Sequence, residues 1–263
     1  MRGRARRWPA TCSAFPAMST GIWSAASGAV AQSASLDTAA NNVANASTPG
    51  FRAETAIFRQ TLVDAIGQNS GTRSQRFAVT RTTSPDLRQG QIVHTGRSLD
   101  VAIGDEKGFF AVATPNGERF TRAGSFRVSV DGTLLTADGH TVLGPSRRPV
   151  QLSPTATSIE IAPDGAISAS GEPTGATVGV FTFANLGGLQ KEGEILFRAG
   201  PEAGPPRIHD GKLESSALEQ SNANAVSSMT TLVNASRQFE MVAKVIEAFS
   251  QIERRAATDI MKR

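Results

Sequence analysis

The sequence contains no tyrosine and a single cysteine among its 263 residues. Because Cys12 has no partner, an internal disulfide and a paired-cysteine metal site are both excluded. Aromatic residues make up only 6% of the chain, and hydrophobic residues 39%. We therefore expect a small core, typical of an elongated protein or of one that buries further surface in an assembly.

The residue patterns of common catalytic sites are also missing. His94, His140 and His209 stand far apart, with none of the spacings of metal ligands. Ser125, in "AGSF", lacks the Gly-x-Ser-x-Gly frame of a nucleophile elbow. The glycine-rich stretch "NLGGLQKEGE" has neither phosphate-loop nor dinucleotide-loop spacing. We predict no catalytic residue, no metal site and no cofactor, and hence a protein that is not an enzyme.

The positive charge of the chain is local. The formal net charge is +4, and residues 1–17 contain four arginines and no acidic residue. No basic stripe with interleaved aromatics follows, so we predict no nucleic-acid partner. No apolar run approaches the ~20 residues that span a bilayer, so we predict no transmembrane segment.

The first 17 residues begin with basic residues but lack the apolar middle of a secretory signal. A regular pattern starts abruptly at Met18. We therefore predict that translation begins at Met18, that residues 1–17 are a non-native or unstructured extension, and that no cleaved signal peptide is used.

An N-terminal helix is predicted from a heptad seam of apolar and small residues. Pro49 and Gly50 are expected to stop this helix. One column of the seam consists only of small residues, which would let a partner helix approach closely. The seam comprises Ile22, Ala26, Ala29, Ser33, Leu36, Ala40 and Val43.

Residues 51–95 show no sustained period and are predicted to be an extended linker, with a short helical piece possible at 61–66. From Leu99 to Leu213 the period is two, which indicates short strands separated by turns. The strand candidates are 99–103, 109–114, 118–122, 125–130, 133–136, 141–143 and 178–183. The tight-turn pairs are Asn116-Gly117, Asp131-Gly132, Asp138-Gly139 and Asp164-Gly165.

The helical period returns from about Ser216, again as two columns at intervals of seven. The first column contains Leu218, Ala225, Leu232, Phe239 and Ile246. The second contains Asn222, Met229, Ser236, Ala243 and Ser250. Further apolar residues, Phe249 among them, make the face wider than a two-stranded coiled coil needs.

The predicted fold class is α+β, with an antiparallel all-β central domain flanked by terminal helices that pair as a coiled-coil-like layer. The predicted domains are a terminal helical assembly domain (18–50 with 214–263), the linker (51–95) and a β-rich domain (96–213).

Three segments, in this order, resemble the bacterial flagellar rod and hook family: "SGAVAQSASLDTAANNVANASTPGFRAE", the β stretch that begins "GRSLDVAIGDEKGFFAV", and "LEQSNANAVSSMTTLVNASRQFEMVAKVIEAFSQI". The chain is most similar to the proximal-rod members, with the distal-rod or another axial hook-basal-body member as the alternative. The charged pair Glu106-Lys107 is a departure from the family pattern.

The resemblance implies a structural subunit of the flagellar basal-body rod, a helical polymer that serves as drive shaft and export channel between the inner-membrane ring and the hook and is needed for motility. The implied partners are copies of the chain, neighbouring rod and hook-basal-body proteins, and the flagellar type III export apparatus. The implied location is the periplasmic rod. Terminal helices that order on assembly are also implied.

Two other classes of function stay open as alternatives. A secreted coiled-coil adhesin with a β head would carry long heptad stalks on one side, whereas short seams flank the β region here. A carbohydrate-binding module would need exposed aromatics, yet Trp8 and Trp23 both lie outside the β region.

The stretch "NNVANASTPGFRAE" is predicted to be a joint between subunits, where amides set the register of packed helices. We expect Asn42→Leu or Phe51→Ala to leave the β domain folded and to block assembly. The N-terminal part of the predicted interface comprises Ile22, Ala26, Ala29, Ser33, Leu36, Ala40, Asn41, Asn42, Val43, Asn45, Pro49, Gly50 and Phe51. The C-terminal part comprises Leu218, Asn222, Ala225, Met229, Leu232, Phe239, Ala243, Ile246 and Phe249.

Overall fold

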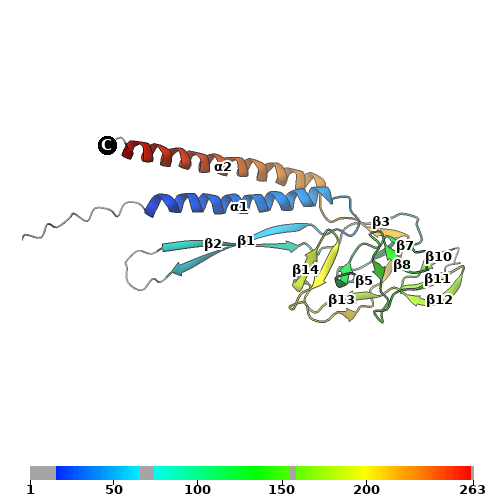
Figure 1. Ribbon diagram of the computed structural model, residues 1–263. Coiled ribbons are helices and arrows are strands. Elements are labelled where there is room, and N and C mark those ends of the chain that lie inside the picture. Colours follow the sequence, from blue (N-terminus) through cyan, green and yellow to red (C-terminus); the bar gives the residue numbers. More distant parts are fainter. Residues whose placement is uncertain (1–15, 66–73, 154–157, 262–263) are drawn as a thin grey trace, which may run out of the picture. The chain divides into compact units, whose positions relative to one another are not determined.

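The computed structural model describes residues 16–65, 74–153 and 158–261. It confirms the α+β class, with a helix near each end of the chain and antiparallel sheets between them (Figure 1). The contacts divide the chain into a helical unit, formed by residues up to 37, 56–82 and 231 onward, and a β unit, formed by 38–55 and 83–230. The terminal segments 18–50 and 214–263 therefore contribute to both units.

Two long helices, α1 (Pro16–Ala44) and α2 (Ala225–Met261), run side by side in the helical unit (Figure 1). The side chain of Gln32 donates a hydrogen bond to the carbonyl of Ala235 at 3.2 Å. Ala34 and Ala235 are both buried, so small residues allow the close approach of the helices. Ala34 lies outside the two columns that were predicted for this helix.

The second helix begins later than the sequence predicts, because a strand precedes it. The expectation of helical structure from about Ser216 is wrong: residues 217–219 form β18 (Ala217–Glu219), which pairs with β3 (Ile92–His94). Leu218 is buried in the β unit. Asn224 then caps α2, since its side-chain oxygen accepts the backbone N–H of Ser227 at 3.0 Å.

The predicted linker also contains strands. β1 (Glu54–Ala65) and β2 (Ser74–Pro85) pair as a two-stranded sheet. The short helical piece considered at 61–66 is therefore wrong for residues 61–65, while Ile66 lies outside the described residues. Isoleucine, phenylalanine, threonine and valine are frequent in this stretch, and such residues favour strands once a partner strand is present.

The largest sheet of the β unit has nine strands in the order β14-β15-β6-β5-β9-β8-β7, and β13 joins it by pairing with both β5 and β16. Its strands are β5 (Phe109–Thr114), β6 (Gly117–Thr121), β7 (Phe126–Val128), β8 (Leu134–Thr136), β9 (Thr141–Val142), β13 (Val180–Thr182), β14 (Leu189–Glu192), β15 (Leu196–Ala199) and β16 (Arg207–Ile208). The short 3-10 helix η1 (Leu186–Gly188) leads into β14.

Smaller sheets complete the unit. One is the three-stranded sheet of β10 (Ile159–Ile161), β11 (Ala166–Ala169) and β12 (Glu172–Thr177). In another, β4 (Val101–Ile103) pairs with β17 (Leu213–Ser215). Strands therefore occupy all the intervals predicted as strands, with shorter bounds in most of them.

The tight turns follow the sequence prediction. In each of the four Asn-Gly and Asp-Gly pairs the glycine has a positive φ, between 78° and 100°. These pairs join β5 to β6, β7 to β8, β8 to β9 and β10 to β11. Only glycine adopts this conformation at no steric cost, so the pairs fix the hairpins locally.

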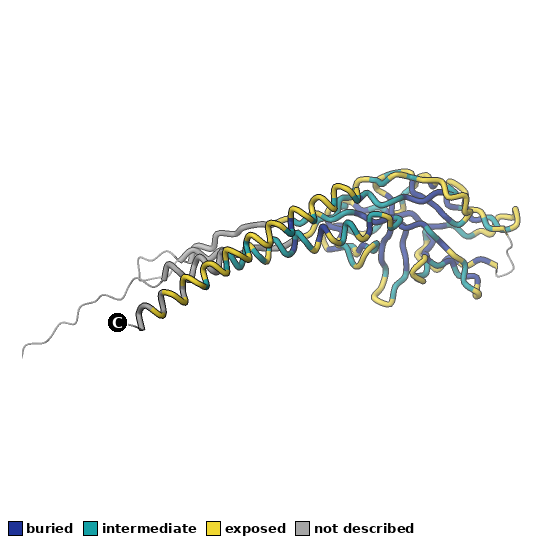
Figure 2. The backbone as a smooth tube through the Cα atoms, turned by 90° about the horizontal axis from the view of Figure 1, so that it is seen from above, coloured by how far each residue is buried: buried dark blue, intermediate teal, exposed yellow. Residues whose placement is uncertain are grey.

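Phenylalanine fills much of the buried interior of the β unit, which is the densely buried part of Figure 2. Phe120 and Phe183 meet edge to face with ring centroids 4.7 Å apart. Phe109 and Phe197 meet in the same way at 5.6 Å. Edge-to-face pairs add to the stabilisation from buried area, so a few rings hold this modest core together.

Candidate functional site: a joint of three chain segments

The stretch "NNVANASTPGFRAE" folds against two other segments within the β unit. We call this region the joint, and define it as residues 41–54, 86–91 and 219–224 together with Arg122 and Lys191. In the sequence, these segments continue into β1, β3 and α2. All members of the joint belong to the same unit.

The side-chain amide of Asn42 forms hydrogen bonds with both the carbonyl and the N–H group of Glu54. Its Nδ2 donates to the Glu54 carbonyl at 2.8 Å, and its Oδ1 accepts the Glu54 N–H at 2.9 Å. The first asparagine of the stretch that lies beyond the helix, Asn45, folds back onto Asn41: its Nδ2 donates to the Asn41 side-chain oxygen at 2.8 Å. These amides hold the end of α1 against the segment that follows it.

Gly50 lets the chain turn closely against the β unit. Its φ is +74°, and its N–H donates to the carbonyl of Glu219 at 2.8 Å. A Cβ atom at this position would collide with the backbone of Arg122 and Ala123. Glycine is therefore required here both by the backbone conformation and by the space available.

Phe51 is fully buried beneath Lys191, which lies on β14. The Lys191 ammonium lies 3.7 Å from the ring centroid and also donates to the Arg52 carbonyl at 2.9 Å. Burial lowers the pKa of Lys191 below its ordinary value, while the nearby Glu54 and Glu194 oppose that effect. Phe51 is thus held by contacts within a single chain.

Asn222 holds all three segments of the joint. Its Oδ1 accepts the N–H of Ala53 at 2.7 Å, and its Nδ2 donates to the carbonyls of Asp86 at 2.8 Å and Arg88 at 2.9 Å. One side chain thereby satisfies backbone groups that precede β1 and follow β2. Asn222 lies before α2 and is not a residue of that helix.

A charge cluster forms the buried floor of the joint. The guanidinium of Arg52 lies 2.6 Å from the carboxylate of Glu219, that of Arg122 lies 3.8 Å from it, and all three side chains are fully buried. Arg122 also donates to the carbonyl of Asp105 at 2.7 Å and lies over the ring of Phe109. Burial is the main cause that lowers the pKa of Arg122 to about 10; Arg52 adds to this effect and Glu219 opposes it.

Arg52, Arg122, Glu219 and Lys191 carry no predicted role from the sequence alone. The sequence predicts a helix at Glu219, whereas the structure places this residue at the end of the short buried strand β18. The partners of this glutamate, Arg52 and Arg122, come from distant parts of the sequence and meet it only in the folded chain.

The other residues of the predicted interface are spread over both helices. Of Ile22, only its place in α1 is described. On α1 the side chains at positions 26, 29, 33, 36 and 43 are half-buried, and Ala40 is exposed. Pro49 is half-buried in the turn that follows α1. On α2 the half-buried members are Ala225, Leu232 and Ile246. The exposed members of the predicted interface on α2 are Met229, Phe239, Ala243 and Phe249.

A polar groove of about 550 Å³ opens beside the joint. Its lining includes Asp86, Gly90 and Asn222 of the joint, together with Glu106. Within the described part of the chain, including this groove, no three His, Cys, Asp or Glu side chains lie close enough together to hold a metal ion. No helix within the described ranges carries an apolar stretch of the length that crosses a membrane.

Three protein families match segments of the chain. The family described as "Flagella basal body rod protein" matches residues 22–52. "Flagellar hook protein FlgE/F/G D1 domain" matches residues 104–169, and "Flagellar basal body rod FlgEFG protein C-terminal" matches residues 214–259. The two terminal matches cover residues 41–52 and 219–224 of the joint.

Curated relatives are similar over most of their length. The flagellar basal-body rod protein FlgF of Caulobacter vibrioides is 30% identical over 227 residues, which cover 86% of this chain and 92% of the relative. The rod protein FlgG of Bacillus subtilis is 32% identical over 238 residues, 82% of this chain and 90% of the relative. FlgF of Escherichia coli is 37% identical over 222 residues, 80% of this chain and 85% of the relative. The resemblance of the three sequence segments is confirmed, and the chain belongs to the flagellar basal-body rod protein family.

Proposed function

We propose that this chain is a structural subunit of the bacterial flagellar basal-body rod and acts in flagellum-dependent motility. The support is its membership of the rod protein family. Its relatives are named as rod proteins, and the similarity extends over nearly their full length. A structural role also agrees with the prediction of a protein that is not an enzyme.

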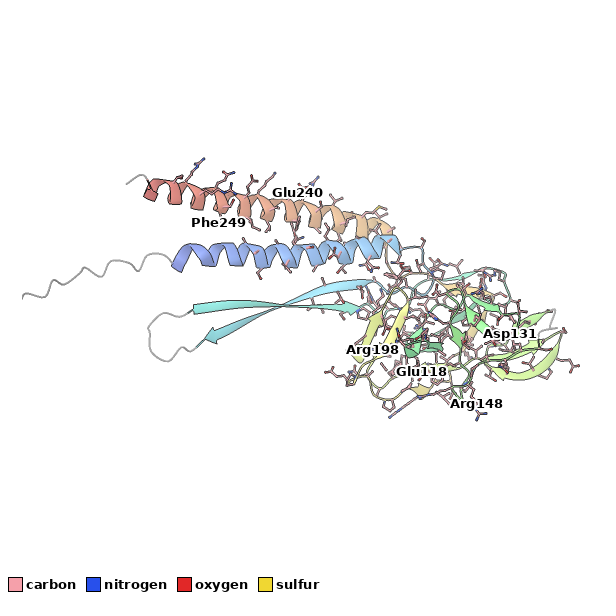
Figure 3. The ribbon with its side chains drawn as sticks, in the orientation of Figure 1. Glu118, Asp131, Arg148, Arg198, Glu240 and Phe249 are labelled. Atoms are coloured by element: carbon pink, nitrogen blue, oxygen red, sulfur yellow. The ribbon has the colours of Figure 1, made fainter. Side chains whose placement is uncertain are left out.

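The observation that carries this proposal is the apolar surface of α2. Met229 is 52% exposed, Met241 58% and Ile252 52%, and among the α2 side chains that the structure describes, Val226, Val233, Phe239, Val245 and Phe249 are also exposed. Figure 3 shows the side chains that project from α2, with Glu240 and Phe249 labelled. Since an isolated chain leaves this surface in water, burial against neighbouring subunits would stabilise an assembly.

Copies joined by a contact whose rotation does not close form an open helical filament. In this proposal the terminal helices supply that contact between copies and with neighbouring rod and hook-basal-body proteins. The filament would serve as drive shaft and export channel between the inner-membrane ring and the hook. The subunit would reach it through the flagellar type III export apparatus without a cleaved signal peptide, as the family resemblance implies.

We place the chain in the proximal part of the rod, with the distal rod as the alternative. The support is the resemblance of the sequence, which is greater to the proximal-rod members of the family than to the distal ones. Relatives named FlgF and FlgG match this chain at similar identity.

The test exchanges one exposed apolar residue of α2 in a strain that lacks the gene. Met241→Glu places a charge on the proposed contact, while glutamate keeps good helix propensity. We expect complementation with this variant to give no filaments, and complementation with Gln238→Glu, a matched change at another exposed position of α2, to restore swimming. Normal swimming with Met241→Glu would argue against α2 as the contact. Normal swimming of the deletion strain, in the absence of a paralogue, would argue against the rod function itself.

A further inference from the structure

In the floor of the joint, two buried cations share a single buried anion. Arg52 and Arg122 both lie against the carboxylate of Glu219, and no part of the three side chains is exposed to solvent. The three side chains together carry one positive charge in excess, and the further carboxylates that act on them lie outside the cluster, Asp86 toward Arg52 and Asp105 and Glu106 toward Arg122. An uncompensated charge in a buried position is destabilising unless hydrogen bonds satisfy it.

The hydrogen bonds within this cluster are also incomplete. In the described structure, none of the three guanidinium nitrogens of Arg52 finds a hydrogen-bond partner, and neither do Nε and Nη1 of Arg122 or Oε2 of Glu219. Arg122 does retain its bond to the carbonyl of Asp105. Arg52 is thus the more poorly satisfied of the two cations, and its main attachment is the ion pair with Glu219.

Glu219 in turn connects the three segments of the joint. Its carbonyl accepts the N–H of Gly50, and its carboxylate accepts the N–H of Gly90, each at 2.8 Å. The next residue, Gln220, donates its N–H to the carbonyl of Gln91 at 2.8 Å. A displacement of Glu219 therefore breaks bonds to both other segments at once.

We propose that Glu219 is an electrostatic latch that fastens the three segments to the β unit as one cooperative unit, and that the excess charge of Arg52 lets this latch open before the β core unfolds. The open state would release residues 50–54, 89–91 and 219–222 together. The nine-stranded sheet, with its apolar phenylalanine interior, would stay folded.

This arrangement predicts opposite effects for the two partners of a single ion pair. Glu219→Gln keeps the shape and an acceptor oxygen but removes the carboxylate that both buried guanidinium groups pair with. Arg52→Met keeps an extended apolar side chain and leaves one cation with one anion. An ordinary stabilising ion pair would instead be weakened by the loss of either partner.

The experiment is amide hydrogen exchange of the purified full chain, measured by NMR. The reporters for the latch are the N–H groups of Gly50, Gly90 and Gln220. The reporters for the core are those of Leu134 and Leu143, which donate to Val150 and Ala111. In the wild-type chain we expect one common protection factor for the three latch amides, lower than that of the core amides.

We expect Glu219→Gln to lower protection of all three latch amides together, by about 100-fold, with the core amides unchanged. Arg52→Met should keep or raise their protection. The control is Glu192→Gln, which removes the same charge from the Arg119–Glu192 pair and should leave the latch amides unchanged.

Three results would overturn the proposal: unequal protection of the latch amides in the wild type, latch protection equal to that of the core, or loss of latch protection in Arg52→Met. If Glu219→Gln does not fold, Arg52→Met decides, since a loss of latch protection there contradicts the excess-charge argument and retained protection supports it.

Discussion

The ammonium group of Lys191 lies 3.7 Å from the centroid of the Phe51 ring and donates a hydrogen bond to the carbonyl of Arg52 at 2.9 Å. This one side chain therefore binds the segment after α1 through both an aromatic face and a backbone oxygen. Because Lys191 is largely removed from water, each of these contacts is stronger than it would be on an open surface.

Replacement of Lys191 by methionine should destabilise the β unit. The variant keeps the apolar stem over Phe51 but loses the cation over the ring and the donor to Arg52. The two losses together predict a decrease in the free energy of unfolding of about 1–2 kcal/mol. Urea unfolding of the full chain measures it. Lys212→Met, at an exposed position, is the control and should change little; equal effects of the two variants would contradict a specific role of Lys191.

The burial of Phe51 changes what is expected of Phe51→Ala. From the sequence, this variant should leave the β domain folded. The ring is fully buried within the β unit, however, so its removal leaves a cavity that costs about 3–5 kcal/mol of folding free energy. We expect a lower urea midpoint for the β unit, whereas Val130→Ala, whose side chain is 93% exposed, should shift it very little. An unchanged midpoint for Phe51→Ala would show that the ring does not hold the joint.

The features that the sequence predicts well are local ones. Asn116-Gly117 and Asp131-Gly132 determine their turns through the backbone conformation of two adjacent residues, and the structure places a turn at both. Family membership was likewise predictable, because it depends on motifs that are continuous in the sequence.

The charge cluster of the joint could not be predicted in the same way. Arg52, Arg122 and Glu219 come from three distant segments, and a single sequence does not indicate which of its charged residues meet. For the same reason Leu218 was assigned to a helix. Its spacing fits a heptad, but its pairing with Val93 of β3 determines its conformation. The asparagines show a related effect, since Asn42 has both hydrogen-bonding groups of its amide engaged within the chain.

Two glycine-to-alanine substitutions should have opposite effects on stability. At Gly50 the positive φ and the contact with Ala123 leave no room for a Cβ atom, so Gly50→Ala should displace the joint and lower the stability of the β unit. At Gly28, inside α1, nothing lies within 4 Å of the added atom. Because alanine favours helix over glycine by about 0.8–1.0 kcal/mol, Gly28→Ala should raise helix content. Urea unfolding and circular dichroism measure the two effects, and a neutral Gly50→Ala would contradict the close approach at the joint.

The contact between Asp105 and His209 should make the stability of the β unit depend on pH in the acid range. The Asp105 carboxylate lies 2.8 Å from Nε2 of His209 and accepts the backbone N–H groups of Lys107 at 2.7 Å and Gly108 at 2.9 Å. Burial raises the pKa of Asp105, but the hydrogen bonds from Lys107, His209 and Gly108 together outweigh it and lower the pKa below its ordinary value of 3.8.

A carboxyl group with a lowered pKa in the folded state binds fewer protons there than in the unfolded chain. Its contribution to stability is therefore present above about pH 4, the ordinary aspartate range, and is lost as the pH falls through the lower pKa of the folded state. Urea midpoints between pH 6 and pH 2.5 should fall less steeply for Asp105→Asn than for the wild-type chain. The matched control is Asp131→Asn, in the exposed turn between β7 and β8 (Figure 3), which removes the same charge away from the Asp105–His209 contact and should keep the wild-type slope. If Asp105→Asn and the wild type lost stability in parallel, the acid dependence would have to arise from other carboxylates, and the Asp105–His209 contact would not stabilise the turn before β5.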